Sequence, residues 1–263
     1  MKVLDRQVPY SFFLDRLQTA PQRILLLDYD GTLAPFTRDR NRAFPYPGVP
    51  ELLSEIMNHD TRLVLISGRP ARELVMLSGT YPHPEIWGSH GLERLLPDGS
   101  HNVRELPAEE GAALLSAADA MRREGLEPHL EIKPGSVALH WRGMGLAEIE
   151  DLRSRALGLW RPLLDKNSLE LLEFDGGIEV RTRRANKGDA VARILREAAA
   201  EAAVAYLGDD QTDEDAFRAL KGRGLTILVR PEPRSTEAEI WLKPPEELTE
   251  FLRQWLIACG GEA

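Results

Sequence analysis

The sequence lacks most features that mark secreted or membrane proteins. Its 263 residues include a single cysteine, Cys259, which excludes an internal disulfide and a metal site built from several cysteines. No apolar run approaches the roughly 20 residues that a transmembrane helix needs. Residues 1–10 contain charges and Pro9 where a signal peptide would carry its apolar segment. We therefore expect a cytoplasmic protein that does not contact a membrane.

A surplus of positive charge is also missing. The chain has 33 Lys and Arg residues against 42 Asp and Glu residues, a formal net charge of -9. Because affinity for nucleic-acid phosphates comes from clustered Lys and Arg, we expect no nucleic-acid partner. A phosphorylated small molecule is still compatible with this charge, since a few cations, backbone N–H groups or a divalent metal can be focused at one site. We expect a small-molecule substrate and a monomeric protein.

The residues that are present have the balance of a globular protein, with 43% hydrophobic and 29% charged residues. Short apolar strands alternate with helical patterns in both outer parts of the chain, which is typical of a parallel sheet flanked by helices. Two hairpin patterns and two helical patterns lie between these parts. We predict an α/β core formed by residues 1–102 and 185–263, interrupted by an inserted α+β domain at 103–184. Strands are predicted at 24–27, 62–66, 85–87, 204–207 and 225–229 in the core, and at 130–133, 136–141, 169–174 and 178–182 in the insertion.

Two carboxylates follow the most apolar of the predicted strands. Residues 24–27 (Ile-Leu-Leu-Leu) form an unbroken apolar run, as expected for a strand buried on both faces. Asp28 and Asp30 come where the run stops, and Gly31 indicates a sharp turn. Ligands of open parallel sheets bind outside the carboxyl ends of the strands. Asp28 and Asp30 are therefore candidate site residues, although an Asp-x-Asp-Gly stretch alone is about as typical of a plain turn.

Later strand and helix ends carry further polar residues. Ser67 lies between a predicted strand and a helical pattern, where an anion is favoured, but a helix-capping serine is the simpler interpretation. Lys187 follows the capping residue Asn186 in a first helical turn, where a cation favours an anionic partner. Asp209 ends a predicted strand and begins an acidic run. Thr212 as the N-cap of the next helix would explain the later acids of that run, but not Asp209.

These residues would meet at one edge of the sheet, and together they suit phosphoryl transfer. Asp28 and Asp209 would repel each other unless a divalent cation joined them, and an all-oxygen site suits Mg²⁺. Asp28 could attack phosphorus and form an aspartyl-phosphate intermediate. Asp30 could protonate the leaving oxygen and then deprotonate the attacking water. Ser67 and Lys187 could hold the non-bridging phosphate oxygens.

The motifs at 28–32 (Asp-Tyr-Asp-Gly-Thr), Ser67, Lys187 and 208–210 (Gly-Asp-Asp) resemble those of the haloacid dehalogenase superfamily of phosphohydrolases. Within it, several segments resemble trehalose-6-phosphate phosphatases. These are 66–69 (Ile-Ser-Gly-Arg), 88–93 (Gly-Ser-His-Gly-Leu-Glu), Glu131 with Lys133 followed by 140–142 (His-Trp-Arg), 186–188 (Asn-Lys-Gly) and 208–217. The resemblance covers nearly the whole chain, from about Arg23 to the last predicted helix.

The resemblance implies a Rossmann-like core with the α+β unit as a cap inserted after the third strand. It also implies a phosphoric monoester hydrolase that requires Mg²⁺ and converts trehalose 6-phosphate to trehalose and phosphate. The metal ligands would be Asp28, the backbone carbonyl of Asp30, and Asp209. Asp210 and Asp213 would lie around these ligands.

The resemblance also implies which residues contact the sugar. They are the residues matching Glu131, Lys133 and Glu179 in the cap. Our own hypothesis is that these three close over a disaccharide together with Arg69 and His90 from the core. Glu131 and Lys133 alternate along one predicted strand, which puts their side chains on the same face. From spacing alone, an exposed salt bridge of little energetic value explains this pair as well as a sugar site does.

Two departures from the family pattern lie on the sugar-facing side. Ser89 stands where these phosphatases usually have Glu before His-Gly, and the segments 176–177 and 181–184 are unlike the usual pattern. A phosphatase of another sugar or glycosyl phosphate is therefore the main alternative. A non-hydrolytic phosphosugar-binding regulator is another, although it would be expected to have lost Asp28 or Asp30. A third alternative is a phosphotransferase or mutase, which passes the phosphate to a sugar. The sequence distinguishes this class poorly from a hydrolase.

Overall fold

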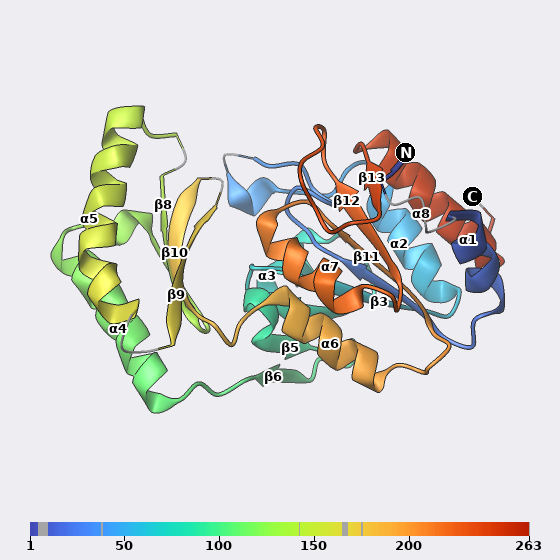
Figure 1. The fold of residues 1–263 in the computed structure, drawn as a ribbon, viewed down its shortest axis with the longest axis horizontal. Coiled ribbons are helices and arrows are strands. Elements are labelled where there is room, and N and C mark those ends of the chain that lie inside the picture. The colour runs from blue at the N-terminus through green and yellow to red at the C-terminus, as the bar shows by residue number, and fades with distance from the viewer. Residues whose placement is uncertain (5–9, 38, 142, 165–167, 175, 263) are drawn as a thin grey trace. The chain divides into compact units, whose positions relative to one another are not determined.

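The computed structural model describes residues 1–4, 10–37, 39–141, 143–164, 168–174 and 176–262. The chain divides into two compact units (Figure 1). The first unit contains Met1–Asn102 and Asn186–Ala263, and the second contains Val103–Ala185. The first unit is a mainly parallel sheet flanked by helices, so the predicted α/β class is confirmed.

The described part of the first unit is built on a nine-stranded sheet with the order β1-β13-β12-β11-β2-β3-β4-β5-β6. The strands from β13 to β4 run parallel, whereas β1 and β5 pair antiparallel with their neighbours. β3, which follows β2 in the chain, lies on one side of β2, and β11, which comes much later in the chain, lies on the other side. This reversal of strand order makes β2 a topological switch point. The bounds are β1 Lys2–Val3, β2 Arg23–Leu27, β3 Thr61–Ile66, β4 Glu85–Gly88, β5 Glu93–Leu95, β6 His101–Val103, β11 Ala203–Gly208, β12 Leu225–Val229 and β13 Ile240–Leu242.

Helices cover both faces of this sheet because β2 is apolar on both sides. Leu25 and Leu27 pack in a core shared with α1, α2, α3 and α8, whereas Ile24 and Leu26 pack against α6 and α7. All four leucine and isoleucine side chains are fully buried, as a strand at the centre of a doubly covered sheet requires. The bounds are α1 Tyr10–Thr19, α2 Val49–Asn58, α3 Ala71–Leu77, α6 Lys187–Glu197, α7 Glu214–Leu220 and α8 Glu246–Ala258, with short 3-10 turns η1 Arg40–Arg42, η2 Ser89–Gly91 and η4 Gln211–Asp213.

The second unit has two layers. Its antiparallel sheet has the order β7-β8-β10-β9, with β7 Leu130–Lys133, β8 Ser136–His140, β9 Leu169–Phe174 and β10 Gly177–Thr182. The helices α4 Ala108–Arg123 and α5 Leu146–Leu164 share a core with one face of this sheet, and η3 Glu127–His129 precedes β7. Because strand side chains alternate, the residues on the opposite face are largely polar.

Several elements were not predicted, and one predicted cap is wrong. The predicted core strands correspond to β2, β3, β4, β11 and β12, but α1 and the short strands β1, β5, β6 and β13 were missed. Asp213, not Thr212, is the N-cap of α7, and its side chain makes no capping hydrogen bond there. Asp210 caps the preceding turn η4, where it forms a capping box with Asp213. Over the described residues, no helix is long and apolar enough to cross a membrane.

Candidate active site

Three neighbouring parallel strands end in the polar residues that the sequence singled out. Asp28 follows β2, Ser67 follows β3 and Asp209 follows β11. Because β11, β2 and β3 are adjacent and parallel, their carboxyl ends lie at the same edge of the sheet. All three side chains are buried. This edge is also where ligands of open α/β sheets bind.

Both carboxylate oxygens of Asp28 are held by other parts of the chain. Lys187 Nζ donates to Asp28 Oδ1 at 2.6 Å, and Thr32 Oγ1 donates to Asp28 Oδ2 at 3.0 Å. Burial raises the pKa of Asp28 to about 7, although the Lys187 ammonium opposes this rise. The structure therefore presents an oriented carboxylate whose charge is poorly compensated.

Asp209 carries a second buried charge with less compensation. Among the described residues, nothing donates a hydrogen bond to its carboxylate, although only 3% of the residue is exposed. Burial, followed by the charges of Asp28 and Asp213, raises the pKa of Asp209 well above its ordinary value. A buried acid of this kind is expected to be neutralised or to meet a cation. Oxygen atoms of Asp28, Asp209 and Asp213 lie within 4.8 Å of one another, which suits a small divalent cation.

Gly31 allows the Asp209 carboxylate to approach the turn after β2. Its φ of 87° lies in the left-handed region, and an added Cβ would come 2.2 Å from Asp209 Oδ2. Both the backbone conformation and the close approach therefore require glycine. The predicted sharp turn after Asp30 is confirmed, and it brings the ends of β2 and β11 together.

Asp213 supports the site and has little capacity to bind anything else. Its Oδ1 accepts from Lys187 Nζ at 2.7 Å and from the Tyr206 hydroxyl at 2.6 Å. Its Oδ2 accepts the backbone N–H groups of Asp209 and Asp210, both at 2.9 Å. The Asp210 side chain is occupied as the N-cap of η4. These contacts fix the loop after β11 and the Lys187 ammonium, which agrees with places for Asp210 and Asp213 around the candidate metal ligands.

Lys187 joins two carboxylates from the first turn of α6. The Asn186 side chain caps this helix by accepting from Asp189 N at 2.7 Å, as predicted. Burial lowers the pKa of Lys187, but the charges of Asp213 and Asp28 more than offset this, so the pKa is raised. The ammonium is therefore a permanent cation beside Asp28.

Asp30 does not share a hydrogen bond with Asp28 but forms a two-point ion pair with Arg69. Arg69 Nε and Nη2 donate to the two carboxylate oxygens of Asp30 at 2.5 and 2.6 Å. The Arg69 side chain is 5% exposed and that of Asp30 is 26% exposed. The guanidinium also lies 3.6 Å from Glu73 and 5.9 Å from the centre of the Tyr29 ring. The predicted acid and a predicted sugar ligand are thus partners in this structure.

Ser67 and His90 lie in contact at the ends of β3 and β4. Ser67 Oγ accepts from Arg69 N at 3.2 Å, and α3 begins after Pro70 without a side-chain cap, so Ser67 is not the capping serine of the simpler interpretation. His90 N donates to Ser67 O at 2.9 Å. The His90 ring lies so close to Gly68 that an added Cβ there would come 2.6 Å from Cε1.

The second unit brings its three predicted sugar ligands onto one face of its sheet. Lys133 Nζ lies 2.7 Å from Glu179 Oε1 and 4.0 Å from Glu131 Oε2. Ser136 Oγ donates to Glu179 Oε1 at 2.7 Å, and His140 Nε2 lies 2.7 Å from Glu131 Oε2. Glu131 and Lys133 do form the ion pair of the alternative interpretation, but their side chains are only 16% and 8% exposed, so this salt bridge is largely buried. Arg142, which belongs to the motif at 140–142, lies outside the described residues.

Sequence reasoning missed several residues that hold the strand ends in place. Arg230 Nη1 and Arg234 Nε donate to the carbonyl of Asp209 at 3.1 and 3.3 Å, and Arg234 Nη2 donates to that of Asp210 at 2.7 Å. The one available signal was the position of Arg230 directly after a predicted strand. Thr32, within the motif at 28–32, could have been named as a partner of Asp28.

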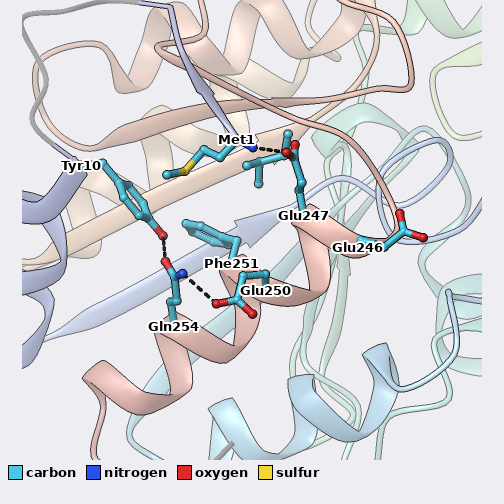
Figure 2. A pocket seen from close by; sticks show the side chains of 8 residues that line it. Met1, Tyr10, Glu246, Glu247, Glu250, Phe251 and Gln254 are labelled. Atoms are coloured by element: carbon cyan, nitrogen blue, oxygen red, sulfur yellow. Dashed lines mark hydrogen bonds and ion pairs between the residues drawn. The ribbon is translucent and has the colours of Figure 1, made fainter.

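A cavity of about 360 Å³ lies elsewhere in the first unit. Figure 2 shows that Met1 and Tyr10 face Phe251 there, with the N-terminal ammonium paired to Glu247. The Tyr10 hydroxyl donates to Gln254 Oε1 at 2.7 Å. No predicted site residue lines this cavity, so it is separate from the strand-end site.

Comparisons with known proteins agree with the geometry of the strand ends. The family model described as Trehalose-phosphatase matches residues 26–242. A trehalose-phosphate phosphatase of Mycobacterium marinum is 31% identical over 247 residues, which cover 89% of this chain but 61% of that protein. The chain thus spans about three fifths of the length of this curated relative.

Solved structures share the fold. The C-terminal domain of Candida albicans trehalose-6-phosphate phosphatase matches with a TM-score of 0.76, 20% identity and 100% coverage of both chains. A phosphatase of the haloalkanoate (HAD) enzyme superfamily from Bacteroides thetaiotaomicron matches with a TM-score of 0.61 and 16% identity, covering 94% of this chain and 97% of that chain. With a family model that extends from the central strand β2 to β13, the chain belongs to the trehalose-phosphatase family.

Proposed function

We propose that this chain is a Mg²⁺-dependent phosphatase that hydrolyses trehalose 6-phosphate to trehalose and phosphate through an aspartyl-phosphate on Asp28. The observation that carries the proposal is the buried cluster of Asp28, Lys187 and Asp209 at the switch point of the sheet. A carboxylate that is oriented by an ammonium and lies beside a second buried acid suits nucleophilic attack on a phosphate.

The phosphoryl group would be received by residues that the fold has already positioned. Lys187 is fixed by Asp28 and Asp213, so its charge is available to non-bridging oxygens without reorganisation. The Ser67 hydroxyl accepts from a backbone amide, which leaves its own hydrogen to be donated to the phosphate. The nucleophile, Asp28 Oδ1 or Oδ2, then forms the bond to phosphorus as the sugar oxygen leaves.

Asp28 and Asp209 suit the Mg²⁺ ion that we propose, because both are buried carboxylates. Burial raises the pKa of each, so a cation beside them would stabilise their charged forms. The predicted third ligand, the Asp30 carbonyl, stays a prediction. When bound, Mg²⁺ would neutralise the charge that Asp28 and the phosphate place close together. Asp213 would hold the loop that carries Asp209 and would not bind the ion itself, because its oxygens already accept four hydrogen bonds.

Asp30 would protonate the leaving sugar oxygen and later accept a proton from the attacking water. In this structure each of its oxygens accepts one hydrogen bond from Arg69, which leaves room for a substrate contact, but carrying the proton for the leaving oxygen would weaken this ion pair and favour release of the guanidinium. A substrate phosphate or hydroxyl would offer Arg69 a new acceptor. This exchange would link binding of the sugar phosphate to release of the acid.

Sugar selection would come from the second unit, where Glu131, Lys133 and Glu179 share one face. Their mutual ion pairs keep the side chains ordered, and a charged group aimed at a hydroxyl makes a strong hydrogen bond. Phosphatase action on another sugar phosphate stays the main alternative. A non-hydrolytic regulator is disfavoured because Asp28, Asp30 and Lys187 are all present.

The test is a panel of phosphorylated sugars assayed for phosphate release with Mg²⁺, with excess chelator, and after Mg²⁺ is restored. We expect the highest kcat/KM with trehalose 6-phosphate, no turnover in chelator, and full recovery with Mg²⁺. Asp209→Asn should fail to recover. Full activity in excess chelator would contradict the metal assignment, and a higher kcat/KM for another sugar phosphate would contradict the substrate.

A further inference from the structure

The polar face of the second unit is arranged in three rows across its sheet. Strand register places Lys133, Ser136, Arg181 and Glu170 in the first row, Glu131, Ala138, Glu179 and Leu172 in the second, and His140, Gly177 and Phe174 in the third. Consecutive rows are two residues apart along the strands, about 7 Å. This separation is comparable to the width of one hexose ring, so a disaccharide is long enough to cover two rows.

The third row combines a ring surface with a hydrogen-bonding group. His140 and Phe174 meet edge to face, with ring centres 5.5 Å apart and an angle of 68° between planes. The Phe174 ring lies directly over Gly177, where an added Cβ would come 2.3 Å from Cζ. On its other side His140 is bound to Glu131, whose Oε2 lies 2.7 Å from Nε2. An aromatic surface therefore adjoins a fixed carboxylate.

This combination matches the surface of an uncharged hexose. A sugar ring has an apolar C–H face and a rim of hydroxyls, and small-molecule sites pair aromatic walls with a few fixed polar groups for such ligands. Among the residues of this face that the structure describes, the formal cations are Lys133 and Arg181, and both lie in the first row. A phosphorylated ring is better placed toward that row, and the uncharged ring toward Phe174.

We propose that His140 and Phe174 select the second, unphosphorylated hexose of the substrate. Phe174 packs against the apolar face of that ring, and His140 acts as a positioning residue that aims the Glu131 carboxylate at its hydroxyls. This inference rests on the proposed function, and it adds a reason why a disaccharide phosphate is preferred over a monosaccharide phosphate. The opposing interpretation is that the two rings merely pack the end of the β9–β10 hairpin.

The experiment compares kcat/KM for trehalose 6-phosphate with that for p-nitrophenyl phosphate in the same preparation, so that the folded fraction cancels in the ratio. Phe174→Leu keeps apolar volume but removes the ring, and the ratio should fall about tenfold, mainly through KM. Phe12→Leu is the matched control, since Phe12 is 66% exposed on α1, and it should leave the ratio unchanged.

His140 is tested by rescue. His140→Leu should lower the same ratio about tenfold, whereas His140→Gln, whose amide can still donate to Glu131, should restore most of it. If Phe174→Leu and His140→Leu lower both activities equally or leave the ratio unchanged, the rings only pack the hairpin and the inference is wrong. If the unaltered chain releases no phosphate from trehalose 6-phosphate, the proposed function fails and the inference fails with it.

Discussion

The two units fix their charged side chains in different ways. In the first unit, Asp28 and Asp213 are joined by Lys187, and these three residues come from distant parts of the sequence. In the second unit, Lys133 and Glu179 pair across a single small sheet. The first arrangement requires residues that follow β2, begin α6 and precede α7, whereas the second requires only the small sheet in which β8 lies between β7 and β10. With the roles proposed above, catalysis would depend on the complete fold of the first unit, whereas sugar selection could change with a few substitutions in the second.

The strongest test of this division is Asp28→Asn. The amide keeps the shape of the side chain but neither attacks phosphorus nor neutralises a cation, so kcat should fall about 10⁴-fold or more. Trehalose 6-phosphate and p-nitrophenyl phosphate should be affected alike. Steady-state kinetics with both substrates, with circular dichroism as the fold control, checks this. Near-native activity would exclude the covalent mechanism.

Asp30→Asn should have the next largest effect. Loss of a general acid and base typically lowers the rate 10²–10⁴-fold. The loss should be smaller for p-nitrophenyl phosphate, because its leaving group needs little protonation. The measurement is kcat for both esters. An equal loss on both would indicate that Asp30 matters mainly through its ion pair with Arg69 and the geometry of the turn.

Glu131→Ala and Glu179→Ala should distinguish the role of the second unit in sugar selection from the role of the first unit in catalysis. Each removes a charged hydrogen bond of about 1.5–3 kcal/mol, which is about a 10- to 150-fold loss in kcat/KM for trehalose 6-phosphate. The ratio to p-nitrophenyl phosphate hydrolysis should fall by the same factor. If both activities decrease together, these residues support the fold, and the proposed division of roles between the two units is wrong.

Gly31→Ala should weaken the metal site without touching a ligand. The new Cβ would collide with Asp209 Oδ2 and the backbone would be strained, so the carboxylate must move. We expect the Kd for Mg²⁺, measured by titration calorimetry, to rise about 10- to 100-fold. Gly48→Ala is a matched control, since Gly48 also has a positive φ but no neighbouring atom within 4 Å of the added Cβ. An unchanged Kd in Gly31→Ala would contradict the role of Asp209.

The last prediction concerns stability in chelator, where no change in catalytic rate is involved. Burial raises the pKa of Asp28 to about 7 and also raises that of Asp209, so the folded state holds more protons than the unfolded state between about pH 4 and pH 7. The free energy of unfolding should then decrease as pH rises through this window, by up to about 1.4 kcal/mol per pH unit for each carboxylate. Tm at pH 5 and 7.5 measures this, and Mg²⁺ should raise Tm more at pH 7.5. A Tm that increases with pH in chelator would contradict a raised pKa for Asp28 and Asp209.

The elements that sequence reasoning found are those with a strong physical pattern. The strand at 24–27 is an unbroken apolar run because helices cover both of its faces, and the residues at strand ends follow from that assignment. The edge strand β1 has two residues and β13 has three, too few to form a pattern. Thr212 was wrongly chosen as the cap of α7 because the short turn η4, capped by Asp210, precedes this helix and contains Thr212.

The sequence did not predict which side chains pair with each other. The pairing of Asp30 with Arg69 joins residues 39 positions apart and depends on the direction of two side chains. The Lys133–Glu179 pair likewise depends on strand order, since β8 lies between the two strands that carry it. The roles of these residues in catalysis and sugar binding stay predictions until the kinetics are measured.

The chain returns from the second unit to the first between Ala185 and Asn186, directly before Lys187. It leaves the first unit after Asn102, next to His101, whose Nε2 lies 3.0 Å from Glu93, the acceptor of the Ser89 hydroxyl. The second connection therefore ends two residues before Lys187, whereas the first is linked to the turn that carries His90 through the contacts of Glu93 with His101 and Ser89. A displacement of Ala185 is therefore expected to act on the start of α6, which carries the Lys187 ammonium.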